Sequence, residues 1–393
     1  MKTAIIHAQL LTPYRTVPNG GLLIENGIIT RIFQGDVPEP VDEIIDAKGN
    51  YASPGFIDIH THGGGGHDFM DGTAEAIIAA AKAHMEHGTT SVLTTTLTST
   101  DEELFELFSN FKAAKKTIQD GPNLLGLHLE GPYFSMEQKG AQDPRFIKTP
   151  DPEHYMKILD ASDDIVRVSA APEIPGALEF GRELSRRGIL ASIAHSDAVY
   201  SQVVEAFENG YTHVTHLYSG MSMLRRINAY RYLGVVESAY MLDEMTVEII
   251  ADGKHLPPEL LRLIMRSKPI DKICLVTDSM RGAGMPEGSH ALLGSLKNGQ
   301  DAIIDDGVAK LPDFSAFAGS VCTADRCIHT MYKLAGVPLI DAVQMITANP
   351  ARIIGVNKHK GILAPGMDAD ICIFDDNITI KTVMVNGKVT VSK

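Results

Sequence analysis

The sequence predicts an α/β protein, a TIM-like (β/α)8 barrel with a small β domain that both ends of the chain form together. The middle of the chain alternates short apolar strands with amphipathic helices, which is the pattern of a parallel barrel. Both ends carry hairpin signals instead. The chain has 393 residues, more than one compact core usually holds, so a second, smaller domain is expected.

The predicted barrel strands are short apolar runs, several of them rich in β-branched residues. They occupy residues 56–60, 91–95, 124–129, 165–170, 189–194, 213–215, 246–250 and 273–277. Helices are predicted over 73–87, which Gly88 ends, over 101–116, which Ser99 and Thr100 open, and over 197–209, which Gly210 ends. Strands and helices in this order favour the barrel.

The two ends of the chain repeat one design. Residues 22–29 place Asn26-Gly27 between two apolar runs, and residues 381–391 do the same around Asn386-Gly387. Asn-Gly between apolar runs is a strong hairpin signal. Because an isolated hairpin is barely stable in water, the two ends are expected to share one sheet. The predicted domains are residues 1–53 plus 356–393, and residues 54–355.

The charge balance limits the classes of partner. Asp and Glu outnumber Lys and Arg by 49 to 35, which gives a formal charge of −14 without any basic run. Such a chain is a poor ligand for nucleic acid or for an anionic membrane surface. An anionic substrate would therefore need a local cluster of positive charge.

Hydropathy and cysteine usage indicate the compartment. No apolar stretch approaches the roughly 18 residues of a membrane helix. His7 and Gln9 interrupt the N-terminal apolar stretch, so it is predicted to be a strand rather than a signal peptide, and a cytoplasmic location is expected. A cytoplasmic chain keeps its thiols reduced. No two cysteines form a CxxC pair, and we expect small core residues at Cys274, Cys322, Cys327 and Cys372.

Residue types that bind metals stand where five of the predicted strands end. The active site of such a barrel lies at the carboxyl ends of its strands. These ends carry, in chain order, His60 with His62, Glu130, His195, His216 and Asp278. Imidazole and carboxylate groups are the ligands of a divalent ion. Each residue alone is more often structural, but convergence at five strand ends favours a metal site.

Spacing suggests roles within this set. His60 and His62 are two apart on a strand, so both side chains point to the same side. Glu130 could bridge two ions because a carboxylate has two oxygens, and Asp278 could bind an ion or accept a proton from water. The glycines at 63–66 are interpreted as backbone that approaches a ligand and offers N–H groups. Other histidines show no such convergence and are interpreted as structural: His7, His84, His87, His154, His213, His290 and His359.

These motifs make the chain similar to known enzymes over nearly its whole length. It resembles the amidohydrolase superfamily and, within it, the N-acetylglucosamine-6-phosphate deacetylases. The resemblance rests on residues 54–64, 128–132, 194–198, 215–218, 251–255, 277–280, 318–320 and 349–351. The HLEGP stretch at 128–132 is the most specific, because many relatives use a carbamylated lysine where these deacetylases have a glutamate, here Glu130.

The resemblance implies the fold and the metal site. It implies a (β/α)8 barrel with a β-sandwich made from both ends of the chain. Glu130, His195 and His216 would hold the principal divalent ion. His60 and His62 would help to hold a second one. Such ligands suit zinc, iron, manganese or cobalt, of which zinc or iron is expected.

The resemblance also implies hydrolysis of the acetamide of N-acetylglucosamine 6-phosphate to glucosamine 6-phosphate and acetate. A bound ion would polarise the amide carbonyl and lower the pKa of its water from roughly 15.7 to about 7. Asp278, the expected catalytic acid and base and a further metal ligand, would take the proton as hydroxide attacks. The same residue would then deliver it to the departing nitrogen.

Substrate recognition is implied on a second set of residues. His255 matches the phosphate-binding histidine of these deacetylases, and Arg231 matches an arginine that reaches the site of a neighbouring subunit, so a homodimer is expected. The segment before Arg231 is longer than usual and adds Arg225 and Arg226, whose roles stay open. The other expected substrate-binding residues are Gln142, Ser219, Gly220 and Gly319.

Departures from the family pattern leave alternatives open. Ser219-Gly220 stand where the family usually has Asn-Ala, and Gln142 stands where some members have a histidine. N-acetylgalactosamine 6-phosphate is therefore an alternative substrate. A cyclic-amide or nucleobase hydrolase is an alternative of another class, against which the HLEGP stretch argues. A non-catalytic scaffold is least favoured, because every ligand position is filled.

Overall fold

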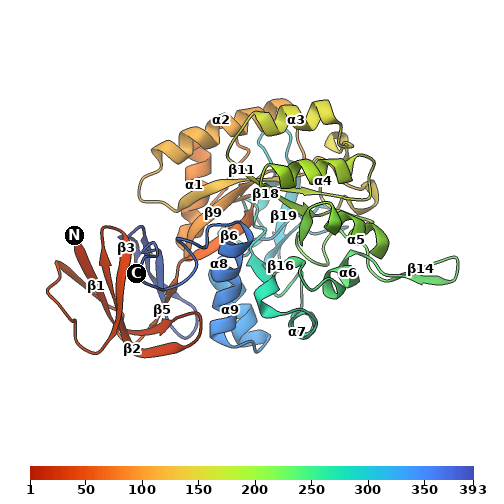
Figure 1. Cartoon of the computed structure of the whole chain (residues 1–393). Helices are drawn as coiled ribbons and strands as arrows, with labels where there is room; N and C mark the ends of the chain where they lie inside the picture. The colour runs from red at the N-terminus through yellow and green to blue at the C-terminus, as the bar shows by residue number, and fades with distance from the viewer.

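The predicted barrel forms the larger part of the computed structural model, which describes residues 1–393 (Figure 1). Its strands are β6 (Phe56–Thr61), β9 (Thr89–Thr95), β10 (Asn123–Glu130), β11 (Ile165–Ala170), β12 (Leu190–Ile193), β13 (Tyr211–Val214), β16 (Thr246–Ile250) and β17 (Ile273–Val276). They form one parallel sheet in the order β17-β16-β13-β12-β11-β10-β9-β6. The outermost pair, β17 and β6, lie side by side where Asp278 N–H donates to the His60 carbonyl at 2.9 Å. The predicted fold class is confirmed.

Helices flank the barrel, and capping residues explain where the first two begin. α1 (Ala74–Met85) starts after Thr73, whose hydroxyl accepts a backbone N–H of its first turn. α2 (Asp101–Thr117) starts after Thr100, which forms a capping box with Glu103. The other helices are α3 (Pro152–Asp160), α4 (Ala177–Arg186), α5 (Tyr200–Glu208), α6 (Val235–Met241), α7 (Pro258–Ser267), α8 (Ala324–His329), α9 (Leu339–Ile346) and α10 (Ala348–Ile353).

Helix α5 begins at Tyr200, later than the predicted start at residue 197. The Asp197 backbone N–H donates to the Glu173 carboxylate at 2.5 Å, and the Asp197 side chain forms an ion pair with Arg225 at 2.6 Å. These tertiary contacts hold the residues after β12 outside the helix. The predicted helix is therefore present, but it begins three residues later than the sequence pattern indicates.

Strands from both ends of the chain form the second sheet, as predicted. They are β1 (Lys2–Leu11), β2 (Thr16–Glu25), β3 (Ile28–Gln34), β4 (Glu43–Asp46), β5 (Tyr51–Pro54), β21 (Ile371–Phe374), β22 (Ile380–Val385) and β23 (Lys388–Ser392). β5 pairs with β21, which joins the two ends in the order β23-β22-β21-β5-β1-β2-β3. Figure 1 shows this sheet beside the barrel, with both termini on it. The exact domain limits stay a prediction.

Both Asn-Gly hairpin turns lie in this sheet and touch each other. Gly27 and Gly387 have φ angles of 82° and 78°, in the left-handed region that favours glycine. A Cβ atom on Gly27 would lie 2.7 Å from the carbonyl oxygen of Asn386. The two turns therefore need glycine both for their backbone angles and for their close approach.

Elements inserted after the barrel strands were not predicted. A hairpin of β14 (Arg225–Ile227) and β15 (Tyr230–Tyr232) projects from the body of the molecule (Figure 1). A three-stranded antiparallel sheet of β18 (His290–Leu293), β19 (Gln300–Asp305) and β20 (Val308–Lys310) lies between β17 and α8. Both insertions consist of short strands, so they carry little periodicity that a sequence pattern could detect.

The main apolar core packs the barrel strands against the helices around them, with Phe56, Phe111 and Phe180 among its largest side chains. A separate cluster, which includes Ile5 and Leu22, lies in the sheet of the two termini. All four cysteines are buried, as predicted. None of the helices combines the length and the apolar character that crossing a membrane requires.

Candidate metal centre and active site

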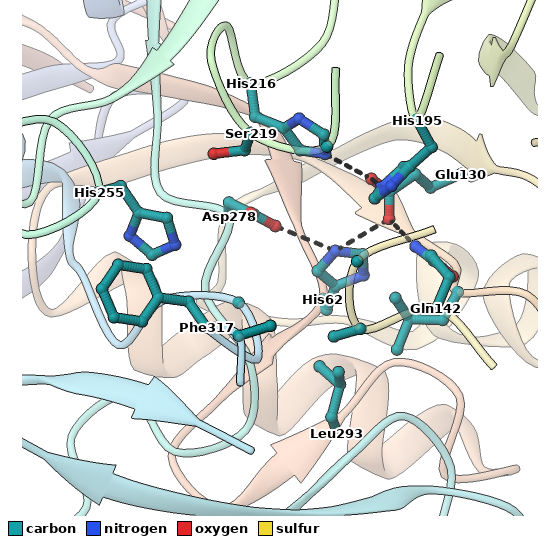
Figure 2. A pocket seen from close by; sticks show the side chains of 16 residues that line it. His62, Glu130, Gln142, His195, His216, Ser219, His255, Asp278, Leu293 and Phe317 are labelled. Atoms are coloured by element: carbon teal, nitrogen blue, oxygen red, sulfur yellow. Dashed lines mark hydrogen bonds and ion pairs between the residues drawn. The ribbon is translucent and has the colours of Figure 1, made fainter. Parts of the chain in front are cut away.

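The carboxylate of Glu130 lies at the centre of the predicted ligand set. Its Oε1 lies 3.0 Å from His216 Nε2 and 3.4 Å from His195 Nε2. On the other side, His62 Nε2 lies 3.5 Å from Oε2, and His60 Nε2 lies 3.6 Å from Oε1. Figure 2 shows His62, His195 and His216 pointing toward this carboxylate. The barrel thus brings together residues that are far apart in the sequence.

Two sets of possible metal ligands share Glu130. One set is His60, His62 and Glu130, and the other is Glu130, His195 and His216. Within each set the ligand atoms lie within 4.8 Å of one another, and all of these residues are buried. Buried imidazole nitrogens that converge on a carboxylate suit a divalent metal ion. We name these the His60 set and the His195 set.

The backbone turns sharply at three of these strand ends. His195, His216 and Asp278 have φ angles of 45°, 26° and 47°, in a region that residues other than glycine rarely adopt. Each is the second residue after the end of a barrel strand. Strained backbone that the surrounding structure maintains is concentrated at functional sites. Here the turn carries three side chains into the common pocket.

Hydrogen bonds fix the orientation of several ligands. His195 Nδ1 donates to the carbonyl of Gln138 at 2.8 Å, which leaves its Nε2 facing Glu130. His60 Nδ1 donates to Glu248 at 2.5 Å in the same manner. Such outer partners set the tautomer and the aim of a metal-binding histidine. Gln142 Nε2 donates to Glu130 Oε2 at 2.7 Å and steadies the shared carboxylate.

The electrostatics of the pocket favour a cation. Burial raises the pKa of Glu130, but hydrogen bonds from His195 and His216 hold it well below its usual range, so the carboxylate is ionised. Burial lowers the pKa of His62, yet the hydrogen bond to Asp278 and the charge of Glu130 raise it to about 9. The carboxylates therefore draw positive charge into the cluster, and a divalent ion would supply it.

Two of the candidate ligands have no hydrogen-bond partner at their second ring nitrogen. The Nδ1 atoms of His62 and His216 are buried and have no hydrogen-bond partner. Their Nε2 atoms face Glu130 at 3.5 Å and 3.0 Å. The polar contacts of these two rings within the chain are therefore made by Nε2, toward the cluster.

Asp278 stands at the edge of the ligand cluster. Its Oδ1 lies 3.1 Å from His62 Nε2 and 3.3 Å from His60 Nε2. Burial raises the pKa of Asp278, and the neighbouring His60 and His62 lower it below its ordinary value. The residue is thus an ionised carboxylate, and it also lines the open pocket. It can accept a proton from a molecule bound there.

The pocket above the ligands has a volume of about 230 Å³. It contains every predicted substrate-side residue except Arg231: Gln142, Ser219, Gly220, His255 and Gly319. Gln142 Oε1 accepts hydrogen bonds from the backbone N–H and the hydroxyl of Thr98, both at 3.0 Å. Because one amide hydrogen already binds Glu130, Gln142 has a single N–H left for a ligand.

His255 lies on the opposite side of the pocket from Gln142, next to Phe317 (Figure 2). The two rings are 4.7 Å apart between centroids. His255 Nδ1 donates to Asp252 at 2.7 Å, which leaves the Nε2 atom as the polar end of the ring. Asp252 also accepts the backbone N–H groups of Lys254 and His255, each at 2.8 Å. The histidine is therefore held rigidly at the pocket wall.

Sequence reasoning missed the apolar wall of the pocket, which Leu97, Leu293 and Phe317 form. Phe317 stands two residues before Gly319, a predicted substrate-binding residue, so its position in the sequence could have indicated that it lies near the pocket. Leu293 belongs to the unpredicted strand β18, and nothing in its local sequence marks it. The orienting contact from Asp252 was accessible, because it lies in the same short motif as His255.

Arg231 lies outside this pocket. It stands on the projecting β14–β15 hairpin, is exposed, and donates only to the carbonyl of Ala229 at 3.2 Å. Arg226 lies opposite Arg231 on the neighbouring strand. Arg225 has a structural partner, because it binds the Asp197 carboxylate at 2.6 Å. Any contact of Arg231 with an active site would have to involve another subunit.

The interpretation of residues 63–66 as a run that offers N–H groups to a ligand is wrong. The N–H groups of Gly63, Gly65 and Gly66 donate to the carbonyls of Ser279, Ala283 and Arg281 at 3.0, 2.8 and 2.9 Å. Residues 63–64 form the short strand β7 (Gly63–Gly64), which pairs with β8 (His67–Asp68). A Cβ atom on Gly63 would lie 2.2 Å from the carbonyl of His67. The glycines thus serve chain packing rather than ligand binding.

Comparisons with known proteins place the chain among amidohydrolases. The Amidohydrolase family model matches residues 51–390. The N-acetylglucosamine-6-phosphate deacetylase of Lysinibacillus sphaericus is 32% identical, over 94% of this chain and 92% of its own. The N-acetylgalactosamine-6-phosphate deacetylase of Escherichia coli O157:H7 is 30% identical, over 98% and 99%.

A solved structure gives the same answer for the fold. The crystal structure of N-acetylglucosamine-6-phosphate deacetylase from Pasteurella multocida superimposes with a TM-score of 0.91, covers 99% of both chains, and is 29% identical in sequence. Its likeness extends over the barrel and the sheet of the two termini alike. The chain belongs to the amidohydrolase family.

Proposed function

We propose that this protein hydrolyses the acetamide of N-acetylglucosamine 6-phosphate to glucosamine 6-phosphate and acetate. The observation that carries the proposal is the shared Glu130 with its two histidine sets, which open onto a pocket beside the Asp278 carboxylate. Relatives that align over nearly the whole chain carry the name of this deacetylase. The reaction class is metal-assisted hydrolysis of a linear amide.

The His195 set would hold the principal divalent ion, and the His60 set would hold a second, with Asp278 as a further ligand. Zinc or iron is the proposed ion, since both accept imidazole and carboxylate ligands. When bound, the ion supplies a Lewis acid for the amide carbonyl and makes water more acidic.

The Asp278 carboxylate moves the proton. It accepts a proton at Oδ1 or Oδ2 from the attacking water and donates it to the departing amine nitrogen. Its contacts with His60 and His62, at 3.3 Å and 3.1 Å, hold it at the floor of the pocket. An amine leaves only when its nitrogen gains a proton, so this second transfer is as necessary as the first.

The sugar phosphate would occupy the pocket above. The remaining N–H of Gln142 and the hydroxyl of Ser219 offer hydrogen bonds to sugar oxygens, while Gly220 and Gly319 leave room for the ring. His255 Nε2 would bind the phosphate. The apolar Phe317 would pack against the sugar ring or its methylene group.

Arg231 of a partner subunit would complete the phosphate site, which implies a homodimer. Arg231→Ala is expected to lower kcat/KM for the phosphorylated sugar by about 10- to 100-fold, because a charge-assisted bidentate contact is lost. Hydrolysis of unphosphorylated N-acetylglucosamine should not change. Arg226→Ala, the cross-strand neighbour in the same hairpin, is the matched control and should behave like the parent. Equal losses on both sugars, or a monomer in solution, would contradict this role.

The galacto epimer is the second candidate substrate, because Ser219 and Gly220 line the pocket and an Escherichia coli relative carries the galactosamine name. Acetate release from the two epimers, measured side by side with metal supplied, tests both. A higher kcat/KM for the gluco sugar is expected. A clear preference for the galacto sugar would place specificity in the Ser219-Gly220 segment, and turnover of neither would refute the substrate assignment.

A further inference from the structure

A fully buried arginine lies inside the barrel beneath the metal ligands. Arg167 on β11 has 0% of its surface exposed and is the largest of the fully buried side chains. Its guanidinium donates to Glu248 Oε2 at 2.6 Å, to the Thr215 hydroxyl at 2.8 Å, to the Ser192 hydroxyl at 3.0 Å and to the carbonyl of Ile59 at 3.2 Å. The charge is therefore well satisfied, although its burial is costly.

The partner carboxylate, Glu248 on β16, connects this arginine to the ligand cluster. Its Oε2 accepts from Arg167 and, at 3.4 Å, from His213 Nε2. Its Oε1 accepts from His60 Nδ1 at 2.5 Å and from the backbone N–H of His216 at 3.0 Å. The carboxylate thus accepts four hydrogen bonds, two at each oxygen, which fills its acceptor sites. Burial raises the pKa of Glu248, but the Arg167 charge holds it well below its usual range.

This arrangement determines which nitrogen of His60 faces the ligand cluster. Because Nδ1 donates to Glu248, the free lone pair of His60 is on Nε2, which lies 3.3 Å from His62 Nε2 and 3.6 Å from Glu130 Oε1. The charged acceptor also makes the ring a stronger electron donor. A buried ion pair contributes little net stability relative to apolar residues of the same size. Because stability alone does not explain the buried Arg167–Glu248 pair, we look for its role in orienting the candidate metal ligands.

We propose that Glu248, held in place by Arg167, is the positioning residue that makes the His60 set able to hold a second ion. This inference rests on the metal site of the proposed function but not on its substrate. The parent protein accordingly binds two ions per chain, one in each set. The His195 set depends less on Glu248, because only the backbone of His216 touches it.

Paired substitutions test this role without leaving a buried charge unpaired. In the Arg167→Met/Glu248→Gln variant, the amide oxygen can still accept from His60 and His216, and the amide nitrogen can donate to His213. Geometry is kept and charge is lost. In Arg167→Met/Glu248→Met, the acceptor is lost as well. Ser192→Ala is the matched control, because it removes one buried hydrogen bond of Arg167 and leaves Glu248 in place.

The measurement is metal binding to the full chain without substrate. Zn²⁺ or Co²⁺ is titrated against a competing chelator, ions per chain are counted by mass spectrometry, and the melting temperature of the metal-free protein is recorded. We expect weakening of one of the two ions by about 10-fold in the first double variant and about 100-fold in the second, in the range seen for outer partners of metal ligands. Ser192→Ala and the parent should both retain two ions.

Three outcomes would overturn the proposal. The first is two ions of parental affinity in both double variants. The second is equal weakening of both ions together with a lower melting temperature, which is the signature of a merely structural pair. The third is a parent that binds a single ion. Since no substrate is used, an inactive protein that binds its ions in this pattern would refute the deacetylase assignment and leave this inference standing.

Discussion

The Asp278→Asn variant is expected to release acetate from the phosphorylated sugar roughly 100- to 10,000-fold more slowly than the parent. An asparagine has nearly the same size and keeps one oxygen that can face His62, now 3.1 Å from Oδ1. It cannot accept a proton from water or donate one to the leaving nitrogen. The loss should therefore appear in kcat, with little change in KM.

Metal content separates this loss from a collapse of the site. Asp278 stands at the edge of the cluster, whereas both ligand sets contain Glu130 and two histidines without it. The variant should thus retain most of its metal, as measured by mass spectrometry on the protein used for kinetics. Asp143→Asn is the matched control, because Asp143 is buried to a similar degree but pairs with Arg145 outside the ligand cluster. Near-parental turnover by Asp278→Asn would refute its role as acid and base.

The convergence of the candidate ligands could be predicted because a barrel places functional side chains at its strand ends, which are local features. Once a run such as 124–129 is identified as a strand, Glu130 must lie at the barrel mouth. The same reasoning places His195 and His216. Their shared pocket follows from the topology, so no long-range contact had to be guessed. The positions of these residues relative to the predicted strands were therefore more informative about the site than the composition of the chain.

The network beneath the ligands could not be predicted in this way. Arg167 and Glu248 are 81 residues apart, and they stand inside strands rather than at their ends. A charged residue in a short strand usually faces solvent, and only the closed barrel shows that both face its interior. The prediction for the glycines at 63–66 was wrong for a different reason. Their backbone freedom was clear, but the partner that used it, residues 279–283, depended on tertiary packing.

The role of Arg231 depends on the assembly of subunits, which the sequence pattern does not describe. Its hairpin is short, exposed and separate from the pocket of its own chain. A sequence gives no direct information about which surface a second subunit covers. The resemblance supplied the expectation of a dimer, and the single chain leaves that expectation as a prediction. The sequence pattern is thus enough to predict strand ends, the fold is needed to see tertiary contacts such as Arg167 with Glu248, and the assembly is needed to place Arg231.

Replacing Glu130 by glutamine is expected to abolish metal binding in both sets and to reduce activity at least as far as the Asp278 change, roughly 10,000-fold. The charge that draws cations into the cluster is lost. The amide must also present its oxygen to the Gln142 N–H, now 2.7 Å from Oε2. Its nitrogen then faces His216 Nε2 and His195 Nε2, now 3.0 Å and 3.4 Å from Oε1.

The new amide N–H groups would occupy the lone pairs that those two histidines need for an ion. The substitution therefore harms the cluster by competition as well as by loss of charge, and added metal should rescue it poorly. Ions per chain and activity are measured over rising Zn²⁺, with Glu137→Gln as the control, since Glu137 is an exposed glutamate in the short 3-10 helix Met136–Gln138. If Glu130→Gln keeps one ion at parental affinity, the two sets do not depend on one carboxylate, and the shared-ligand arrangement would have to be abandoned.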